Sequence, residues 1–338
     1  MKKHLIPEGG NFYKVNLHCH TSLSDGTLTP EEVKEIYKKE GYSAVAFTDH
    51  DALIPHHKEL SDDEFIALNG FEITLSEKET SERLGVKRTC HMCFIAKDPE
   101  NITHVCWFHR VHYDKNIDKV VIEDKPEFKV DFTPECVNEA IARAKAAGFY
   151  VTYNHPTWSR NGYSDYINFK GADAMEIVNY GCVCLGYPEY NERVYDDMLF
   201  GGERLACVAA DDNHNKHPGT AEWDSFGAWV WVKADKLGYR EITAALERGD
   251  YYASTGPEIL DVYCEDGKIF VKTSPVARIR FSTGTRHAKL VANADGSHVT
   301  EGSMTLKEKD EYVRVTVVDE KGRTAYTRAY FLDELSKN

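Results

Sequence analysis

The sequence of 338 residues has no apolar run that approaches the length of a membrane span, which is about 18 residues. The segment that follows Lys2 and Lys3 is not apolar either, so we expect no signal peptide. Positive charge is in the minority, because 41 Lys and Arg stand against 55 Asp and Glu, a formal charge of −14. Such a charge repels the phosphate backbone of nucleic acids. We therefore expect a cytoplasmic protein that binds neither a membrane nor a nucleic-acid polymer.

The nine cysteines are irregularly spaced and odd in number, which does not indicate a disulfide framework. Without an export signal they are expected to be reduced, as in the cytoplasm. Cys90 and Cys93 have the spacing of a zinc or redox pair, but a zinc site needs a second ligand pair at a comparable spacing, and none is obvious. Hydrophobic residues make up 42% and charged residues 28%, values that predict a packed core and exclude a wholly disordered chain.

Strands and helices alternate through the first three quarters of the sequence. Residues 13–18 read as a strand, 29–41 as a helix with a Thr-Pro-Glu-Glu start, and 43–47 as a wholly apolar strand. The same alternation returns over residues 133–153 and 174–210. This order is typical of an α/β barrel or a doubly wound parallel sheet.

The pattern changes at about Ser254, where short alternating runs are broken by Gly and Asp and no segment has helical periodicity. Residues 312–317 are one such run. We predict two domains, an α/β domain over residues 1–253 and a small antiparallel, sandwich-like β domain over residues 254–338.

Side chains that can bind a metal follow one predicted strand after another. His18 and His20 are two positions apart at the end of the first strand, so both face the same side. That pair alone is weak evidence, because chance produces such a spacing in a chain with 15 His. Glu72 lies in an otherwise apolar run, where an unpaired carboxylate would be costly without a cation or a donor.

Taken singly, each of these residues is also explained as a hydrogen-bonded buried side chain. Their repetition at six strands favours a shared site, because barrel enzymes build their sites where the strands end. The candidate metal ligands are His18, His20, Asp25, His50, Glu72, His91, His155, Asp212 and His214.

These motifs resemble those of the PHP superfamily, named for polymerase and histidinol phosphatase. The residues that carry the resemblance are His18-x-His20, Ser24-Asp25-Gly26, Thr48-Asp49-His50-Asp51, Glu72, His91, His155-Pro156 and Asp212-x-His214. They cover about 200 residues in the order of the family. The resemblance implies a distorted (β/α)7 TIM-like barrel with two or three divalent ions at its C-terminal mouth.

The resemblance also implies how the ligands are shared. His18, His20, Glu72 and Asp212 would hold the first ion. Glu72 would bridge to a second ion that His91 and His155 complete. Asp25, His50 and His214 would hold the third.

The sequence departs from the family at Ala210, Asp211 and Asn213, where Gly, Ser and Ala are usual. The β tail resembles that of two-domain bacterial PHP proteins, among them a subgroup akin to carbaryl hydrolase. Members of that subgroup cleave esters or amides rather than phosphates, so the resemblance leaves open which bond is cut.

Imidazoles and carboxylates without a thiolate suit Zn, Mn or Fe, whereas Mg and Ca prefer more oxygen ligands. Bound ions would make the mouth positive, so that an anionic substrate could enter an acidic protein. A water bridging two such ions would be a nucleophile at neutral pH. Glu72 and Asp212, as ligands, would then take part in catalysis.

Three residues are candidates for contact with the substrate. Arg160 would clamp a phosphate oxygen, or it is a surface arginine. Lys216 would contact the anion and His217 would be a general acid, or both belong to a solvated loop. The charged stretch over residues 101–131 is either a lid over the mouth or an ordinary surface segment.

We therefore predict a metal-dependent phosphoesterase that hydrolyses a small phosphorylated metabolite or nucleotide through a metal-bridging hydroxide. One alternative is an ester or amide hydrolase that uses the same ions. The other is a catalytically silent module whose β domain binds a partner. The sequence does not indicate the oligomeric state.

Overall fold

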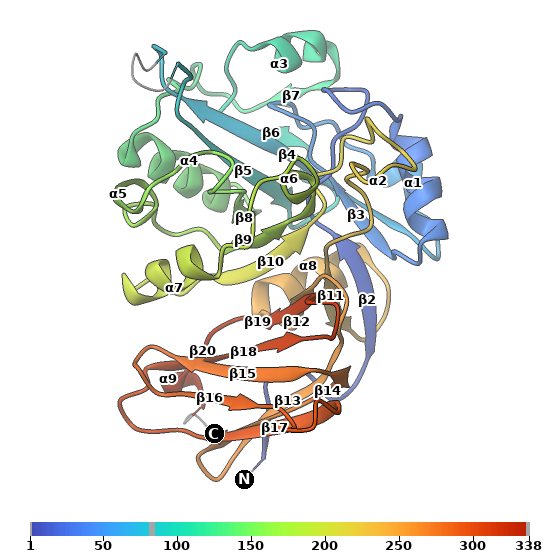
Figure 1. Cartoon of the computed structure of the whole chain (residues 1–338). Helices are drawn as coiled ribbons and strands as arrows, with labels where there is room; N and C mark the ends of the chain where they lie inside the picture. The colour runs from blue at the N-terminus through green and yellow to red at the C-terminus, as the bar shows by residue number, and fades with distance from the viewer. Residues whose placement is uncertain (1, 81–84, 336–338) are drawn as a thin grey trace.

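The computed structural model describes residues 2–80 and 85–335, which form an upper lobe of helices and strands and a lower lobe of strands (Figure 1). Strand β1 (Lys3–His4) pairs with a strand of the lower lobe, and helix α9 (Leu332–Leu335) lies there too. Both ends of the described chain therefore lie on the side of the molecule opposite the upper lobe.

Seven strands of the upper lobe lie side by side, in the order β10-β9-β8-β5-β4-β3-β2. They are β2 (Asn11–Asn16), β3 (Ala44–Phe47), β4 (Ile66–Ser76), β5 (Thr89–Ala96), β8 (Phe149–Tyr153), β9 (Ala174–Asn179) and β10 (Ala206–Ala210). All but β5 run in the same direction, and β5 is antiparallel to both of its neighbours. The expected α/β fold is confirmed, and the reversed strand is what makes it irregular.

The two edge strands of this run meet beyond their C-terminal ends. Cys19 and Asn213, which follow β2 and β10, form a parallel bridge. The backbone N–H of His20 donates to the carbonyl oxygen of Asn213 at 2.9 Å, and that of Asp212 donates to His18 at 3.0 Å. These bonds join the segments that carry candidate ligands from opposite edges of the sheet.

Helices connect the strands of the upper lobe along the chain (Figure 1). They are α1 (Pro30–Lys39), α2 (His57–Leu60), α3 (Val111–Lys115), α4 (Pro134–Ala146), α5 (Tyr163–Tyr166), α6 (Tyr180–Cys184), α7 (Glu192–Phe200) and α8 (Tyr239–Arg248), with a 3-10 turn at Ile117–Lys119. The predicted start of α1 is confirmed by a capping box, in which the Thr29 side chain accepts from the N–H of Glu32 and the Glu32 carboxylate accepts from the N–H of Thr29. The short pair β6 (Thr103–His104) and β7 (Val121–Ile122) lies in the loop segment that follows β5.

The lower lobe consists of antiparallel strands, as the alternating sequence predicted. They are β13 (Ile259–Glu265), β14 (Lys268–Val276), β15 (Arg278–Thr283), β16 (Ala288–Val291), β17 (Val299–Thr305), β18 (Tyr312–Val318), β19 (Thr324–Thr327) and β20 (Tyr330–Phe331). One sheet has the order β1-β13-β14-β17, and the other strands extend the large sheet. A separate apolar cluster, which includes Ile259, Phe281 and Val315, fills the space between the two sheets.

The large sheet continues from one lobe into the other. Strand β11 (Trp229–Ala234) pairs with β2, and β12 (Tyr251–Ser254) pairs with both β11 and β19. An ion pair with a buried arginine adds a second connection, because the Arg314 guanidinium on β18 contacts the partly exposed Asp196 carboxylate on α7 at 2.7 and 2.8 Å. The domain boundary at residues 253 and 254 falls at β12 and stays a prediction.

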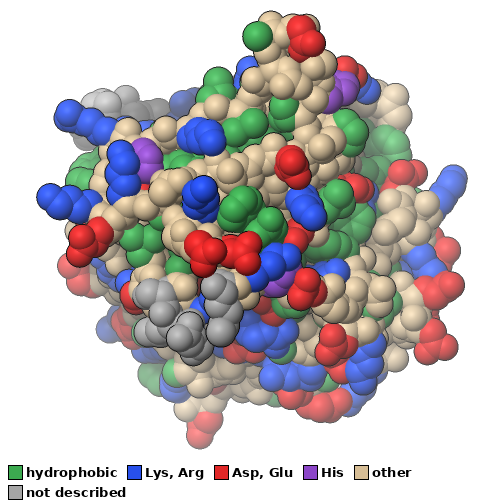
Figure 2. All heavy atoms as spheres, turned by 90° about the horizontal axis from the view of Figure 1, so that it is seen from below, with side chains coloured by type: hydrophobic (Ala, Val, Ile, Leu, Met, Phe, Trp, Pro, Cys, Tyr) green, Lys and Arg blue, Asp and Glu red, His purple; other side chains and the backbone are tan. Residues whose placement is uncertain are grey.

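Within the described residues, no helix is long and apolar enough to cross a membrane. The lower face shows basic and acidic side chains interspersed with hydrophobic ones (Figure 2). The described part of this face has no broad patch of positive charge of the kind that binds a nucleic-acid backbone.

Candidate metal centre

The candidate ligands come together where the parallel strands of the upper lobe end. His18 and His20 follow β2, His50 follows β3, His155 follows β8, and Asp212 and His214 follow β10. Each position just beyond a strand aims its side chain into the same mouth, because parallel strands end at the same edge.

Two candidates reach the mouth in a different way. Glu72 lies within β4, and its backbone forms a parallel bridge with that of His50. His91 is the third residue of β5. The expectation that the candidates stand at strand ends is wrong for Glu72, which lies inside β4, and for His91, because β5 is antiparallel and its beginning faces the mouth.

Glu72 is the centre of the cluster. One carboxylate oxygen, Oε1, lies 3.2 Å from His18 Nε2, 3.1 Å from His155 Nε2 and 3.3 Å from His91 Nδ1. The other, Oε2, lies 3.0 Å from His50 Nδ1 and 3.4 Å from His20 Nε2. A single carboxylate that is fully buried therefore contacts five imidazoles from four segments of the chain.

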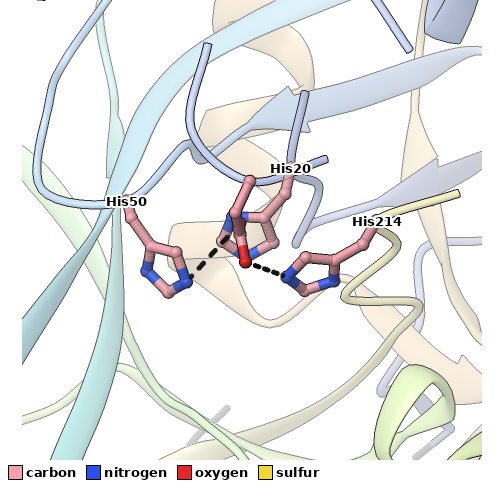
Figure 3. Close-up of side chains that lie close together, drawn as sticks. His20, His50 and His214 are labelled. Carbon is pink, nitrogen blue, oxygen red and sulfur yellow. Dashed lines mark ion pairs between the residues drawn. The ribbon is translucent and has the colours of Figure 1, made fainter. Parts of the chain in front are cut away.

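Asp212 and Asp25 complete the cluster on either side of Glu72. Asp212 Oδ1 lies 3.1 Å from His18 Nε2 and 3.0 Å from His20 Nε2. Figure 3 shows His20, His50 and His214 pointing toward one another around a carboxylate group. That carboxylate is Asp25, 3.3 Å from His214 Nε2, 3.8 Å from His20 Nδ1 and 3.9 Å from His50 Nε2.

The ligand atoms fall into four groups in which all atoms lie within 4.8 Å of one another. The groups are His20, Asp25, His50 and His214; His18, His20 and Glu72; His18, His155 and Asp212; and His50, Glu72 and His91. His155 is thus grouped with His18 and Asp212, whereas the resemblance pairs it with His91. The assignment of ligands to individual ions stays a prediction.

Charge and burial oppose each other in this cluster. Burial alone would lower the pKa of His18, but the charges of Asp212 and Glu72 raise it well above its usual range. Burial disfavours the ionised form of Glu72, yet His18 and His91 bring its pKa well below the usual range. Burial lowers the pKa of His91 to about 4, so this ring is neutral at pH 7, the form that binds a metal.

The donor set fits divalent cations. His50 Nδ1 and Glu72 Oε2 are buried without a hydrogen-bond partner, although they lie 3.0 Å apart. No lysine or arginine of the described chain forms an ion pair with Glu72 or Asp212, so the negative charges meet only imidazoles and amides. Buried carboxylates facing imidazole nitrogens are the environment that a bound divalent ion requires.

A comparison with known families agrees with this geometry. Residues 16–176 match the model of the family described as PHP domain. The chain contains a PHP domain. No curated protein matches the chain.

Three solved structures resemble the chain at a distance. A two-domain protein from Bacteroides vulgatus containing a predicted PHP-like metal-dependent phosphoesterase is 14% identical, with 97% of this chain and 98% of that chain covered and a TM-score of 0.46. A candidate metal-dependent phosphoesterase from Bifidobacterium adolescentis is 19% identical, with 71% of this chain and 97% of that chain covered and a TM-score of 0.40. An amidohydrolase from Chromobacterium violaceum, with bound sulfate and no metal, is 19% identical, with 61% of this chain and 88% of that chain covered and a TM-score of 0.37.

The structure adds a carboxylate behind the ligands that sequence reasoning missed. Glu176 lies on β9, and its Oε1 is 2.7 Å from Nδ1 of His18. Its other oxygen accepts from the backbone N–H of His155 at 2.9 Å. Glu176 is a polar residue in an apolar strand, the same signal that singled out Glu72, so the sequence pattern could have identified it.

The Glu176 contact predicts a measurable effect on metal affinity. A carboxylate that accepts from the far nitrogen of a ligating imidazole orients the ring and makes it a stronger ligand. We expect Glu176→Gln to weaken binding of the most tightly held ion about tenfold, measured by titration against a competing chelator. Glu35→Gln, at an exposed carboxylate on α1, is the control that should bind as the wild type does. Equal affinities for the two variants would exclude this role of Glu176.

The PHP domain has a cavity of about 300 Å³ over the ligand cluster. Lys216 and His217 both line it, together with Trp158 and Leu185. The Lys216 ammonium lies 3.5 Å from an Asp25 oxygen. The structure therefore brings these two predicted substrate contacts to the candidate metal ligands.

Arg160 does not line this cavity. It lines a neighbouring one, of about 790 Å³, which shares Trp158 with the first. The structure thus separates Arg160 from the ligand cluster, although it follows His155 by only five positions.

The charged stretch after β5 packs against the mouth of the PHP domain. The Lys115 ammonium donates to the carbonyl oxygen of Ser22 at 2.9 Å, and the Asn116 amide donates to that of Leu23 at 2.8 Å. The His112 ring lies 5.6 Å from that of His50, and its buried Nδ1 has no hydrogen-bond partner. The segment therefore covers one side of the mouth.

Proposed function

We propose that this protein is a metal-dependent phosphoesterase that hydrolyses a small phosphorylated substrate. The observation that carries the proposal is the position of Glu72, a buried carboxylate in contact with five imidazoles directly beneath a cavity that also presents a lysine. A domain kept only for its shape has no physical need for so many converging ligands, which argues against a silent module.

The residues of the chain would hold two or three divalent ions, with Zn, Mn and Fe the best match to imidazole and carboxylate ligands. His18, His20, Glu72, His91, His155 and Asp212 would hold the inner ions, and Asp25, His50 and His214 the outer one. When bound, such ions supply Lewis acidity that favours attack of water on phosphorus and stabilises the charge of the leaving oxygen.

In the proposed reaction, a water oxygen forms a bond to phosphorus while the ester P–O bond breaks, and the departing oxygen takes a proton. Lys216 would bind a phosphoryl oxygen, since its ammonium stands in the same cavity as the ligands. His217 would donate the proton to the leaving oxygen. Its Nε2 lies 3.8 Å from a Glu222 oxygen, and that carboxylate would orient the ring.

We also propose that the protein acts in the cytoplasm on a small anionic molecule rather than on a nucleic-acid polymer. The formal charge of −14 supports this, because it disfavours a polyanion while the ions bound at the mouth would attract a small phosphate ester. All nine cysteines are free thiols in the structure, which fits a reducing compartment.

The test is a direct assay of phosphate release. The protein is purified without chelators, loaded with Mn²⁺ or Zn²⁺, and incubated with a panel of phosphomonoesters and nucleotides, with Glu72→Ala as the blank. Metal-dependent release that the blank lacks supports the proposal and ranks the substrates. A loaded protein that releases no phosphate but cleaves carboxyl esters or amides contradicts it and favours the alternative hydrolase.

A further inference from the structure

A second cavity, which Arg160 lines, lies next to the cavity over the candidate ligands. At about 790 Å³ it is larger than the cavity over the ligands, at about 300 Å³. Trp158 lines both of them. The two cavities therefore adjoin at Trp158, and we call the second one the Arg160 cavity.

Trp158 contacts the metal ligands on one side. Its ring lies 5.0 Å from the His155 ring and 5.5 Å from the His91 ring, measured between centroids. The same indole is therefore a wall of the metal cavity and the boundary of the Arg160 cavity. Whatever extends from a phosphoryl group bound at the ligands toward this side must pass an aromatic face.

The Arg160 cavity is positively charged although the protein is acidic. Lys87, Arg88 and Arg160 line it, against the single acid Asp165. Arg88 is neutralised, because its guanidinium pairs with Glu77 at 2.6 Å and with Asp165 at 3.3 Å. Lys87 and Arg160 form no ion pair with any residue of the described chain, so two cations remain for a ligand.

The loop that carries Arg160 is held firmly by hydrogen bonds. The buried Glu189 carboxylate accepts from the backbone N–H groups of Thr157 at 2.9 Å and Trp158 at 2.7 Å. The Asn161 amide donates to the carbonyl oxygen of Thr89 at 2.8 Å, while its oxygen accepts from Tyr153 at 2.7 Å. These bonds fix the backbone on both sides of Arg160.

Arg160 itself has a positive φ of 59°, a conformation that few residues other than glycine adopt. Such a conformation persists only where the surrounding structure imposes it. Its guanidinium lies 5.4 Å from the centre of the Tyr187 ring, which also lines the cavity. The loop therefore presents a cation and two aromatic rings, Trp158 and Tyr187, in a preformed arrangement.

We propose that the substrate carries a second acidic group, beyond its scissile phosphate, which Arg160 and Lys87 bind in the Arg160 cavity. This inference rests on the proposed function and narrows its substrate class to small phosphomonoesters that are acidic at both ends. A planar or apolar portion between the two acidic groups passes over Trp158. Arg160 is then a specificity-determining residue for the distal group, and Lys216 remains the contact for the scissile phosphate.

The test uses matched, non-hydrolysable ligands, so that binding is measured independently of turnover. Benzylphosphonates carry at the para position a carboxylate or the corresponding neutral carboxamide, joined through one to three methylenes. Their affinities for the metal-loaded protein are measured by calorimetry. We expect the best carboxylate to bind about tenfold more tightly than its carboxamide, because a charge-assisted contact with an exposed arginine is of this size.

Three variants show whether the named residues cause the preference. Arg160→Gln is expected to reduce the ratio of the two affinities to about one, and Lys87→Gln to reduce it by about half. Arg286→Gln, at an exposed arginine of the lower lobe, should keep the wild-type ratio. Equal binding of acid and amide at every length, or an unchanged ratio in Arg160→Gln and Lys87→Gln, overturns the inference.

The corresponding aryl phosphates separate this inference from the proposed function. Hydrolysis of both members of a pair at equal rates, with equal binding of the phosphonates, retains the phosphoesterase and excludes the acidic subsite. A carboxylate preference in the phosphonates without release of phosphate from any ester retains the subsite and excludes the phosphoesterase.

Discussion

Replacing Glu72 by alanine should abolish phosphate release and remove more than one equivalent of metal from each chain. Both carboxylate oxygens face imidazoles, Oε1 facing three and Oε2 facing two, so the side chain serves more than one group of ligands. We expect activity to fall by about three orders of magnitude or more, because the Lewis acidity of the bound ions would lower the activation free energy by several kcal/mol. Metal content is measured by elemental analysis of the dialysed protein.

A second variant at Glu72 removes the charge while it keeps the packing of the cluster. Glu72→Gln retains the size of the side chain and one acceptor oxygen but removes the charge, and it should also lower metal content, though by less than alanine does. Glu35→Ala on the surface of α1 is the matched control and should keep both metal and activity. Full metal content in both Glu72 variants, with the fold intact by circular dichroism, would show that Glu72 does not bridge ions.

The positions of most candidate ligands could be predicted because they depend on local rules. Two His separated by one residue at the end of a strand face the same way, and parallel strands place their ends at one mouth. This reasoning holds for His18, His20 and Asp212, which the structure brings within about 3 Å of one another. The positions of these three residues could therefore be predicted without knowledge of long-range packing.

The direction of β5 could not be predicted, because its apolar sequence is equally suited to a parallel and an antiparallel neighbour. Direction is set by the connection between β4 and β5, part of which lies outside the described residues. The grouping of His155 with His18 likewise depends on side-chain packing across the sheet. The sequence position of a ligand therefore predicts that it lies at the mouth, but not which other ligands it contacts there.

Arg160 shows the same limit for substrate contacts. Its closeness to His155 in the sequence suggested the scissile phosphate, but the turn with positive φ at Arg160 places it in the neighbouring cavity. Short sequence separation across a tight loop therefore does not imply a shared site. The structure instead separates the two proposed anion contacts, because Lys216 lines the cavity over the candidate ligands and Arg160 lines the neighbouring one.

Two of the three departures from the family pattern, Asp211 and Asn213, belong to a buried network behind the candidate metal centre. Asp211 accepts five hydrogen bonds, from the backbone N–H groups of residues 226–228 and from the hydroxyls of Tyr37 and Tyr42. The Asn213 oxygen accepts from the Asn16 amide at 3.1 Å, and the Asn16 oxygen accepts from the backbone N–H of Asp211 at 3.0 Å. This network ties β2, α1 and the segment before β11 to the loop that carries Asp212.

Asp211→Ala should destabilise the protein by about 3 kcal/mol or more, because each buried donor left without an acceptor costs about 1–3 kcal/mol. Burial raises the pKa of Asp211 to about 6 even though backbone N–H groups donate to it, so the group is held in an apolar setting where lost partners are not replaced by water. Urea unfolding followed by circular dichroism measures the change.

Graded variants distinguish the network from a general loss of packing. Tyr37→Phe removes one of the five donors and should cost about 1 kcal/mol, while Asp211→Asn, which keeps one acceptor oxygen, should fall between Tyr37→Phe and Asp211→Ala. Asp63→Ala, at an exposed carboxylate, should leave the free energy of unfolding unchanged. If Asp211→Ala were no less stable than Asp63→Ala, Asp211 would not hold the loop of Asp212 in place, and the departure from the family pattern would have no structural role.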